Sequence, residues 1–199
     1  MIIVVVGRAG SGKTAVAKEI CKLMDLPLVE MSTIVQNFLK ASKEHRGEIN
    51  KDIADHEKQD PDWLWKEVER EIIKVGKGAG RHCVLSGIRE PYLLHKIRQW
   101  KWTDVCVVGL EVSEFNRYSR LCNRDGFVSV KEFKKIDNGT KEKDGYVGDN
   151  ELGIDITLTG CNFMVNANGT LEEVRNSISK LFMTKEIITP QNVNVKKNP

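Results

Sequence analysis

The sequence has no apolar run long enough to cross a bilayer, since the longest, Ile2–Val6, falls far short of the roughly 20 residues that a membrane-spanning helix needs. It also lacks the pattern of a secretory signal peptide. Aromatic residues make up only 7% of the chain, but 40% of it is apolar and 30% is charged, as in soluble globular proteins. We therefore expect a cytoplasmic protein without a membrane partner.

The sequence shows neither a cysteine pattern nor a large excess of one charge, either of which would indicate a disulfide-rich, zinc-binding or DNA-binding protein. The five cysteines are scattered without a C-x-x-C pair, and the four histidines show no ligand spacing, so neither a disulfide framework nor a zinc site is expected. Lysine and arginine number 31 against 28 aspartates and glutamates, and most of the net charge of +3 lies in residues 184–199. A dedicated duplex-DNA-binding protein usually shows a basic stripe, so DNA is expected only as an alternative substrate.

Apolar segments that suit strands alternate with segments of helical periodicity. Short, mostly apolar runs, the first of them entirely β-branched, predict strands at residues 2–6, 28–31, 83–85, 105–110 and 163–165. Thr170 and Glu173 have capping-box spacing at the start of a final helix, 171–182. This alternation predicts the α/β class, with an open, parallel five-stranded sheet and helices on both of its faces. The helix after Pro61 should bury one apolar face, made of Trp63, Leu64, Val68, Ile72 and Ile73.

The chain length of 199 residues fits one domain, which we place at residues 1–183. Two strongly charged stretches, at about 32–75 and 114–151, interrupt the alternation of strands and helices. We expect them to lie over the carboxyl ends of the strands, where open α/β sheets bind ligands. Residues 184–199 are expected to form a flexible tail.

Residues 7–14 read GRAGSGKT and match the phosphate-binding P-loop pattern G-x-x-x-x-G-K-[ST], with a strand before and an amphipathic helix after. Glycine lets such a loop turn tightly and bring backbone N–H groups against phosphate oxygens. Lysine then contacts the β- and γ-phosphates, and the threonine hydroxyl binds Mg²⁺. The loop predicts ATP and Mg²⁺ as cofactors. Its predicted nucleotide-binding residues are Gly7, Ala9, Gly10, Ser11, Gly12, Lys13 and Thr14, with Lys13 also catalytic and Thr14 also a metal ligand.

The rest of the sequence favours a kinase over other P-loop proteins. It contains neither the N-K-x-D guanine signature nor a strand ending in Asp-Glu. Instead, Arg89 follows the third predicted strand, where its guanidinium can bind an acceptor phosphate or the transferring group.

Three arginines after the fourth predicted strand form a second cationic group. Arg117, Arg120 and Arg124 are spaced by three and four residues, so they share one face of a helix. Opposite a triphosphate they would neutralise the charge that spreads over the transferring phosphoryl group. A helix with these arginines, followed by a glycine-dotted segment, is typical of a closing lid.

Four segments together resemble the small P-loop kinases of the adenylate kinase, dephospho-coenzyme A kinase and phage deoxynucleotide kinase group. They are the loop at 7–14, Ser86-Gly87-Ile88-Arg89, the arginine triplet, and Val165-Asn166-Ala167-Asn168-Gly169-Thr170-Leu171-Glu172-Glu173, and the likeness spans about 1–182. It implies the P-loop kinase fold, an acceptor-binding insertion at about 32–75 and a lid at about 114–151. It also implies that Arg89 holds the acceptor and that Arg117 and Arg120 contact the nucleotide, with Arg120 and Arg124 catalytic.

The sequence departs from this group at two carboxylates. Many relatives have an aspartate after the third strand that supports Mg²⁺ through water, whereas this chain has Ser86 and Gly87. Relatives that phosphorylate a hydroxyl carry an aspartate near the end of the second strand as general base, and here the candidate is Glu30. Three roles stay open for Glu30: the base, a metal-binding group and a structural carboxylate that caps the next helix.

These observations predict a kinase that moves the γ-phosphate of ATP to a nucleotide-type acceptor, most simply a (deoxy)nucleoside monophosphate. The alternatives are the hydroxyl of 5-hydroxymethylpyrimidines in DNA and dephospho-coenzyme A. An acceptor-independent ATPase switch is less favoured, because no residue is evident that would position a catalytic water. The protein is expected to be a monomer or a homodimer.

Overall fold

The computed structural model describes residues 1–39, 56, 58–78, 81–100, 103–138, 149 and 152–184. The expected tail beyond residue 184 and the middle parts of both predicted insertions lie outside the described residues. In the described part of the chain, no helix combines the length and the apolar character needed to span a membrane.

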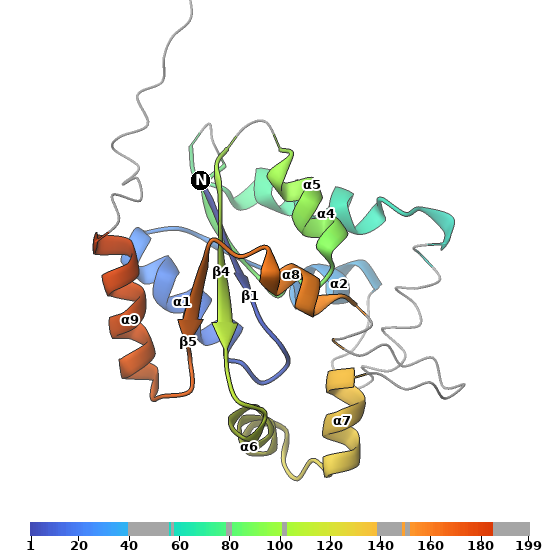
Figure 1. Cartoon of the computed structure of the whole chain (residues 1–199). Coiled ribbons are helices and arrows are strands. Elements are labelled where there is room, and N and C mark those ends of the chain that lie inside the picture. The colour runs from blue at the N-terminus through green and yellow to red at the C-terminus, as the bar shows by residue number, and fades with distance from the viewer. Residues whose placement is uncertain are drawn as a thin grey trace, which may run out of the picture.

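A five-stranded, all-parallel sheet forms the centre of the molecule (Figure 1). Its order is β2-β3-β1-β4-β5, so the first strand lies in the middle. The parallel sheet confirms the predicted fold class. The strands are β1 (Ile2–Val6), β2 (Leu28–Glu30), β3 (Cys83–Ser86), β4 (Val105–Glu111) and β5 (Phe163–Asn166).

Helices cover both faces of the sheet, as the alternating pattern predicted. In Figure 1, α1 and α9 lie on one side of the strands and α4 and α5 on the other, while α6 and α7 lie beyond the carboxyl ends of the strands. The helices are α1 (Lys13–Met24), α2 (Met31–Leu39), α4 (Trp63–Val75), α5 (Pro91–Arg98), α6 (Glu114–Asp125), α7 (Val130–Asn138), α8 (Ile154–Thr159) and α9 (Leu171–Thr184).

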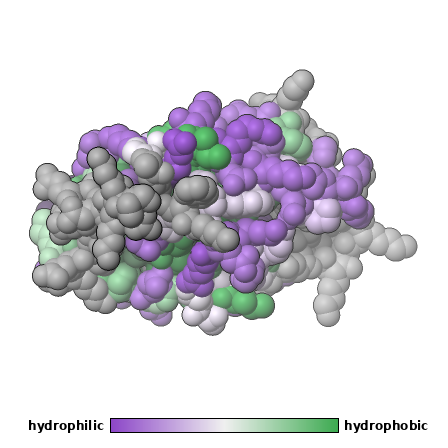
Figure 2. Space-filling model, turned by 90° about the horizontal axis from the view of Figure 1, so that it is seen from above, coloured by the Kyte–Doolittle hydropathy of each residue, from purple (hydrophilic) through white to green (hydrophobic). Residues whose placement is uncertain are grey.

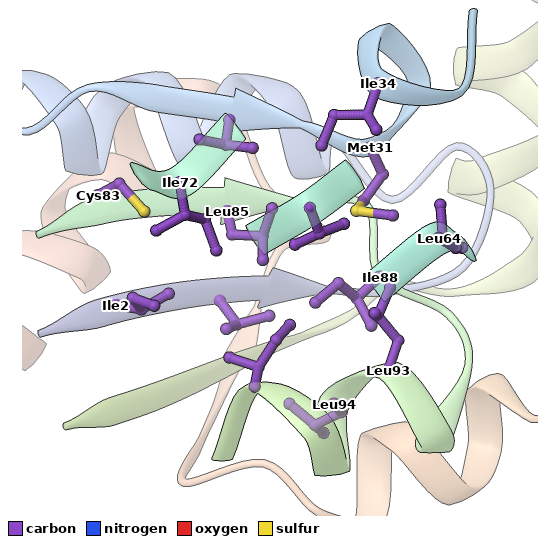
Figure 3. Packing of buried hydrophobic residues seen from close by; sticks show 14 of the residues in the cluster. Ile2, Met31, Ile34, Leu64, Ile72, Cys83, Leu85, Ile88, Leu93 and Leu94 are labelled. Atoms are coloured by element: carbon purple, nitrogen blue, oxygen red, sulfur yellow. The ribbon is translucent and has the colours of Figure 1, made fainter. Parts of the chain in front are cut away.

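The side chains of β1 alternate between two hydrophobic cores, one on each face of the sheet. Ile3 and Val5 face α1 and α9, whereas Ile2, Val4 and Val6 belong to the core beneath α2, α4 and α5. All five are fully buried, as expected for a central strand of a parallel sheet. The core beneath α2, α4 and α5 is drawn in Figure 3.

The packing of α4 corrects one detail of the predicted helix face. Trp63 and Ile72 are buried, but Ile73 is 45% exposed. Successive helical residues point about 100° apart, so the stripe centred on Trp63, Val68 and Ile72 leaves its neighbour Ile73 at the solvent edge. Figure 3 shows Leu64 and Ile72 facing the sheet beside Leu85 and Ile88.

The surface that is coloured in Figure 2 is mostly hydrophilic, and apolar side chains form only small separate groups on that face. Large apolar residues that are strongly exposed are scattered along the described chain, and Phe115, Phe127 and Met183 are examples. Single exposed apolar residues of this kind are normal in globular proteins.

Candidate active site

The loop between β1 and α1 has the backbone of a phosphate-binding turn. Gly10 and Gly12 have φ values of 76° and 87°, in the left-handed region that L side chains rarely adopt. A Cβ atom on Gly10 would lie 2.5 Å from the carbonyl oxygen of Arg117, so glycine is required there by space as well. Gly7 packs closely against Ser11, whose hydroxyl is buried and has no hydrogen-bond partner among the described residues.

Lys13 and Thr14 begin α1 at the end of this loop. The Nζ atom of Lys13 donates hydrogen bonds to the carbonyl oxygens of Gly7 (2.7 Å) and Arg8 (2.9 Å). Burial, together with the positive charge of Arg89, lowers the pKa of Lys13 to about 7. The negative charge of Asp149 offsets these effects only in part, so this position is well suited to a phosphate group.

Arg89 lies beside the loop, as the sequence predicted, but it already has an anionic partner. Its Nη1 atom is 3.2 Å from Oδ1 of Asp149, and the Arg89 side chain is 34% exposed. Asp149 is fully buried, and its Oδ2 atom accepts a hydrogen bond of 2.5 Å from the backbone N–H of Ala9 in the P-loop. Asp149 therefore joins the loop to Arg89.

Sequence reasoning did not single out Asp149, because nothing local distinguishes it from the other acidic residues of the charged stretch at 114–151. Neither apolar periodicity nor a cap surrounds it. Its importance depends on contacts with Ala9 and Arg89, which are 140 and 60 residues away in the sequence.

Arg117 differs from the sequence expectation in its surroundings. Its guanidinium is buried and forms a two-point ion pair with Asp137 of α7, at 2.5 Å and 2.9 Å. It also lies over the ring of Phe133, 5.3 Å from the centroid. Arg117 thus holds α7 against α6, and a contact with nucleotide would require it to share or exchange Asp137.

Arg120 and Arg124 extend from the same side of α6 to different partners. Arg120 donates hydrogen bonds to the carbonyl oxygens of Ser11 (3.4 Å), Ala167 (2.7 Å) and Gly169 (3.2 Å). It therefore ties the P-loop to the segment between β5 and α9. Arg124 pairs with Asp125 at 2.5 Å, and its charge contributes to lowering the pKa of Lys13.

Helices α6 and α7, which lie in the stretch predicted to form a lid and are called the lid helices below, contact the P-loop directly. Ala9 forms a small hydrophobic cluster with Leu121 of α6 and Phe133 of α7. Tyr118 packs edge-on against Phe133 at a ring distance of 5.4 Å. Arg8 adds an ion pair to Asp137 at 3.3 Å, so both apolar and charged contacts join α7 to the loop.

Glu30 lies on the α1 face of the sheet. It pairs in register with Ser86, and Leu28, two residues earlier on the same face, belongs to the core beneath α1 and α9. The charge of Glu30 contributes to the raised pKa of the Cys21 thiol, although burial is the larger cause. Glu30 is the last residue of β2 and lies level with Ser86 and Val5, so its backbone is at the carboxyl edge of the sheet, where the P-loop also begins.

The described side chains that could ligate Mg²⁺ at this site are too few to hold the ion without a bound nucleotide. Among the described residues, no group of three or more histidine, cysteine, aspartate or glutamate side chains is arranged to hold a metal ion. Thr14 is exposed at the start of α1, beside the phosphate-binding loop. Mg²⁺ is usually bound through one or two protein oxygens together with substrate phosphates and water, and the Thr14 hydroxyl fits that arrangement.

A family model described as an AAA domain matches residues 3–135, which include the P-loop, Arg89 and the arginines of α6. A search of curated proteins finds no match. Among solved structures, the shikimate kinase of Acinetobacter baumannii is similar, with a TM-score of 0.57 and 13% identity over 94% of this chain and 95% of that one. The shikimate kinase of Bacteroides thetaiotaomicron has a TM-score of 0.56 and 14% identity over 92% of this chain and 98% of that one. An uncharacterized protein from Eubacterium ventriosum is similar too, with a TM-score of 0.56 and 16% identity over 93% of this chain and 99% of that one. At these identities the likeness shows the fold, which is that of small P-loop kinases.

Proposed function

The chain belongs to the AAA-domain family, and we propose that within it the protein is a kinase that transfers the γ-phosphate of ATP to a small, nucleotide-type acceptor. The observation that carries this proposal is the neighbourhood of Lys13. A desolvated lysine at the P-loop lies within electrostatic range of Arg89, Arg117 and Arg124, which come from two other parts of the chain. A cationic group of this kind at the carboxyl edge of a parallel sheet suits phosphoryl transfer.

Each part of the site has a role in the proposed reaction. Lys13 and the loop amides hold the β- and γ-phosphates, and Arg124 adds positive charge where charge develops in the transition state. Arg120 positions the P-loop through its hydrogen bond to Ser11. Arg89 faces the acceptor. Thr14 would contribute its hydroxyl to Mg²⁺, which supplies charge neutralisation between the β- and γ-phosphates when it is bound.

The nucleotide character of the acceptor is supported by the sequence resemblance, and two acceptor chemistries are compatible with it. A (deoxy)nucleoside monophosphate needs unpaired positive charge near Arg89, because its phosphate is already anionic. A hydroxyl acceptor, such as dephospho-coenzyme A or a 5-hydroxymethylpyrimidine in DNA, needs a carboxylate instead. The ion pair between Arg89 and Asp149 favours the second chemistry.

DNA as the carrier of that hydroxyl receives little support from the described tryptophans. Trp65 packs edge-on against Trp100 at a ring distance of 6.0 Å, and Trp100 is only 9% exposed. Stacking on bases requires an accessible aromatic face. A free small molecule is therefore the acceptor that we favour.

The test measures ADP release with ATP and Mg²⁺ against a panel of free monophosphates, dephospho-coenzyme A, and DNA with and without 5-hydroxymethylpyrimidines. We expect turnover to rise at least tenfold with one acceptor class and to be abolished in Lys13→Met. Lys18→Met is the matched control, since Lys18 is an exposed lysine on the same helix. Lys13-dependent turnover that no acceptor changes would instead identify an ATPase switch.

A further inference from the structure

Asp149 is the described carboxylate that touches both halves of the proposed site. Its Oδ2 atom accepts the N–H of Ala9 in the P-loop at 2.5 Å, and its Oδ1 atom lies 3.2 Å from Nη1 of Arg89. The residue is 0% exposed. A single buried side chain thus lies between the loop that would hold the donor phosphates and the arginine that faces the acceptor.

One of the two carboxylate oxygens is not satisfied. Oδ1 of Asp149 has no hydrogen-bond partner within the described residues, and its contact with Arg89 is an ion pair without hydrogen-bond geometry. A carboxylate oxygen can accept two hydrogen bonds, and buried polar atoms without a partner are rare because they are costly. Oδ1 is therefore a free acceptor position that points to a ligand carrying an O–H or N–H group.

The other candidate carboxylates of the site lie elsewhere around it. Glu30 ends β2 on the α1 face of the sheet. Glu90 accepts the backbone N–H of Arg89 through Oε2, and burial raises the pKa of its carboxyl group. Ser86 and Gly87 bring no carboxylate to the end of β3. Asp149 is left as the acceptor group next to both Ala9 and Arg89.

The charges around Arg89 disfavour an anionic acceptor at this point. Asp149 pairs with Arg89 directly, and Glu90 is close enough to interact electrostatically with both of them. A dianionic phosphate entering beside Arg89 would face the carboxylate of Asp149, and like charges in a partly buried site repel strongly. A neutral hydroxyl group would meet no such penalty and would supply the hydrogen that Oδ1 lacks.

We propose that Asp149 is the proton acceptor for a hydroxyl group of the acceptor, so that the substrate of this kinase is an alcohol rather than a phosphate. This inference rests on the proposed kinase function. The O–H bond of the acceptor breaks and its proton moves to Oδ1 of Asp149, while the acceptor oxygen forms a bond to the γ-phosphorus of ATP. The bond between the γ-phosphorus and the β–γ bridging oxygen breaks, ADP leaves with that electron pair, and Asp149 later releases the proton to water.

The first experiment uses the wild-type enzyme and identifies the atom that receives the phosphate. The probes are dephospho-coenzyme A, 5-hydroxymethyl-2′-deoxycytidine monophosphate, which carries a hydroxyl and a phosphate on one molecule, and the four unmodified deoxynucleoside monophosphates. Phosphorus NMR of the products separates a phosphomonoester from a diphosphate. We expect a phosphomonoester. A diphosphate product would overturn the proposal about Asp149 while leaving the kinase function intact.

The second experiment compares Asp149→Asn with the wild type on the alcohol acceptor found in this way. Loss of the proton acceptor should lower kcat at least 100-fold, while ATP binding, measured by calorimetry on the folded variant, changes less than threefold. Asp155→Asn is the matched control, because Asp155 pairs with Arg8 but is 65% exposed, and its kcat should stay within threefold. A kcat of Asp149→Asn within threefold of the wild type would refute the role. If Asp149→Asn does not fold, the product identity still decides the substrate class.

Discussion

Asp137 balances the buried positive charge between the lid helices and the P-loop. It contacts Arg117 through both carboxylate oxygens and Arg8 through one. Burial alone would raise the pKa of Asp137, but the hydrogen bonds and charge of Arg117, together with Arg8, hold that pKa below its usual value of 3.8. The ionised form is thus favoured in the folded protein.

We expect Asp137→Asn to lower the free energy of unfolding by about 3 kcal/mol at pH 7, because it leaves the buried Arg117 guanidinium without its counter-charge. A depressed folded-state pKa adds stability above the usual aspartate pKa, and that stability is lost as the pH falls through the folded-state pKa. The difference between variant and wild type should therefore shrink below pH 3.8. Urea unfolding at pH 7 and at pH 3 measures both values.

Lys74→Gln provides the control for this prediction. Lys74 forms an exposed ion pair with Glu71 on α4, and its side chain is 69% exposed. Such pairs contribute roughly 0.2–0.5 kcal/mol. If Asp137→Asn lowered the free energy of unfolding at pH 7 no more than Lys74→Gln does, the buried ion pair would contribute no more to stability than an exposed one.

At the residue scale, the sequence predicts groups whose chemistry depends on near neighbours. Lys13, Thr14 and the glycines of the loop belong to one contiguous motif, so the sequence places them correctly at the start of α1. Asp149 and Asp137 gain part of their roles from the loop between β1 and α1, more than a hundred residues away. No pattern in their own neighbourhood reports such contacts.

The α7 helix docks on the P-loop mainly through one aromatic ring. Phe133 is 2% exposed and contacts Tyr118, Arg117 and the cluster that contains Ala9 and Leu121. Its removal leaves a cavity at the junction of three elements, and phenylalanine-to-alanine changes in cores cost about 3–5 kcal/mol. Because this cluster is separate from the two large cores, the loss should be confined to the lid helices.

We expect Phe133→Ala to raise amide hydrogen exchange at residues 130–138 at least tenfold and to leave the amides of β1 unchanged. Hydrogen exchange followed by mass spectrometry resolves the two segments. Phe127→Ala is the matched control, since Phe127 lies between the same two helices and is 89% exposed. Equal acceleration in β1 and α7 would show instead that the lid and the sheet unfold as one unit.

At the element scale, strands and long helices followed their sequence patterns closely. All five predicted strands lie within one residue of their observed ends, because buried parallel strands are short, apolar and bounded by breaks. The capping box of α9 is also present, with Thr170 N–H donating to Glu173 at 2.7 Å. The short helices α7 and α8 were not predicted individually, because few apolar residues define them and their stability comes from tertiary contacts.

For the whole molecule, nucleotide binding should appear as added stability. A ligand at 100 times its Kd stabilises a folded protein by about 2.7 kcal/mol. For a domain of this size, 1 kcal/mol raises the Tm by about 2–4 °C. We therefore expect ATP with Mg²⁺ to raise the Tm by about 5–10 °C, measured by differential scanning fluorimetry.

The variant Lys13→Met should lose most of this shift, because the amino group that would contact the β- and γ-phosphates is absent. Lys18→Met should keep it, since Lys18 is exposed on α1. If millimolar ATP left the Tm of the wild type unchanged, that result would contradict the proposal that the P-loop binds ATP.

The central place of β1 in the sheet has a consequence for how the protein is made. Its two neighbours are β3 and β4, so this strand leaves the ribosome before either of its partners, residues 83–86 and 105–109. Until β4 has emerged, the nascent chain carries five consecutive apolar residues without a complete set of backbone partners. Unpaired apolar strands of this kind are prone to aggregation. Successful synthesis therefore depends on protecting β1, which leads into the P-loop, until residues 105–109 have been translated.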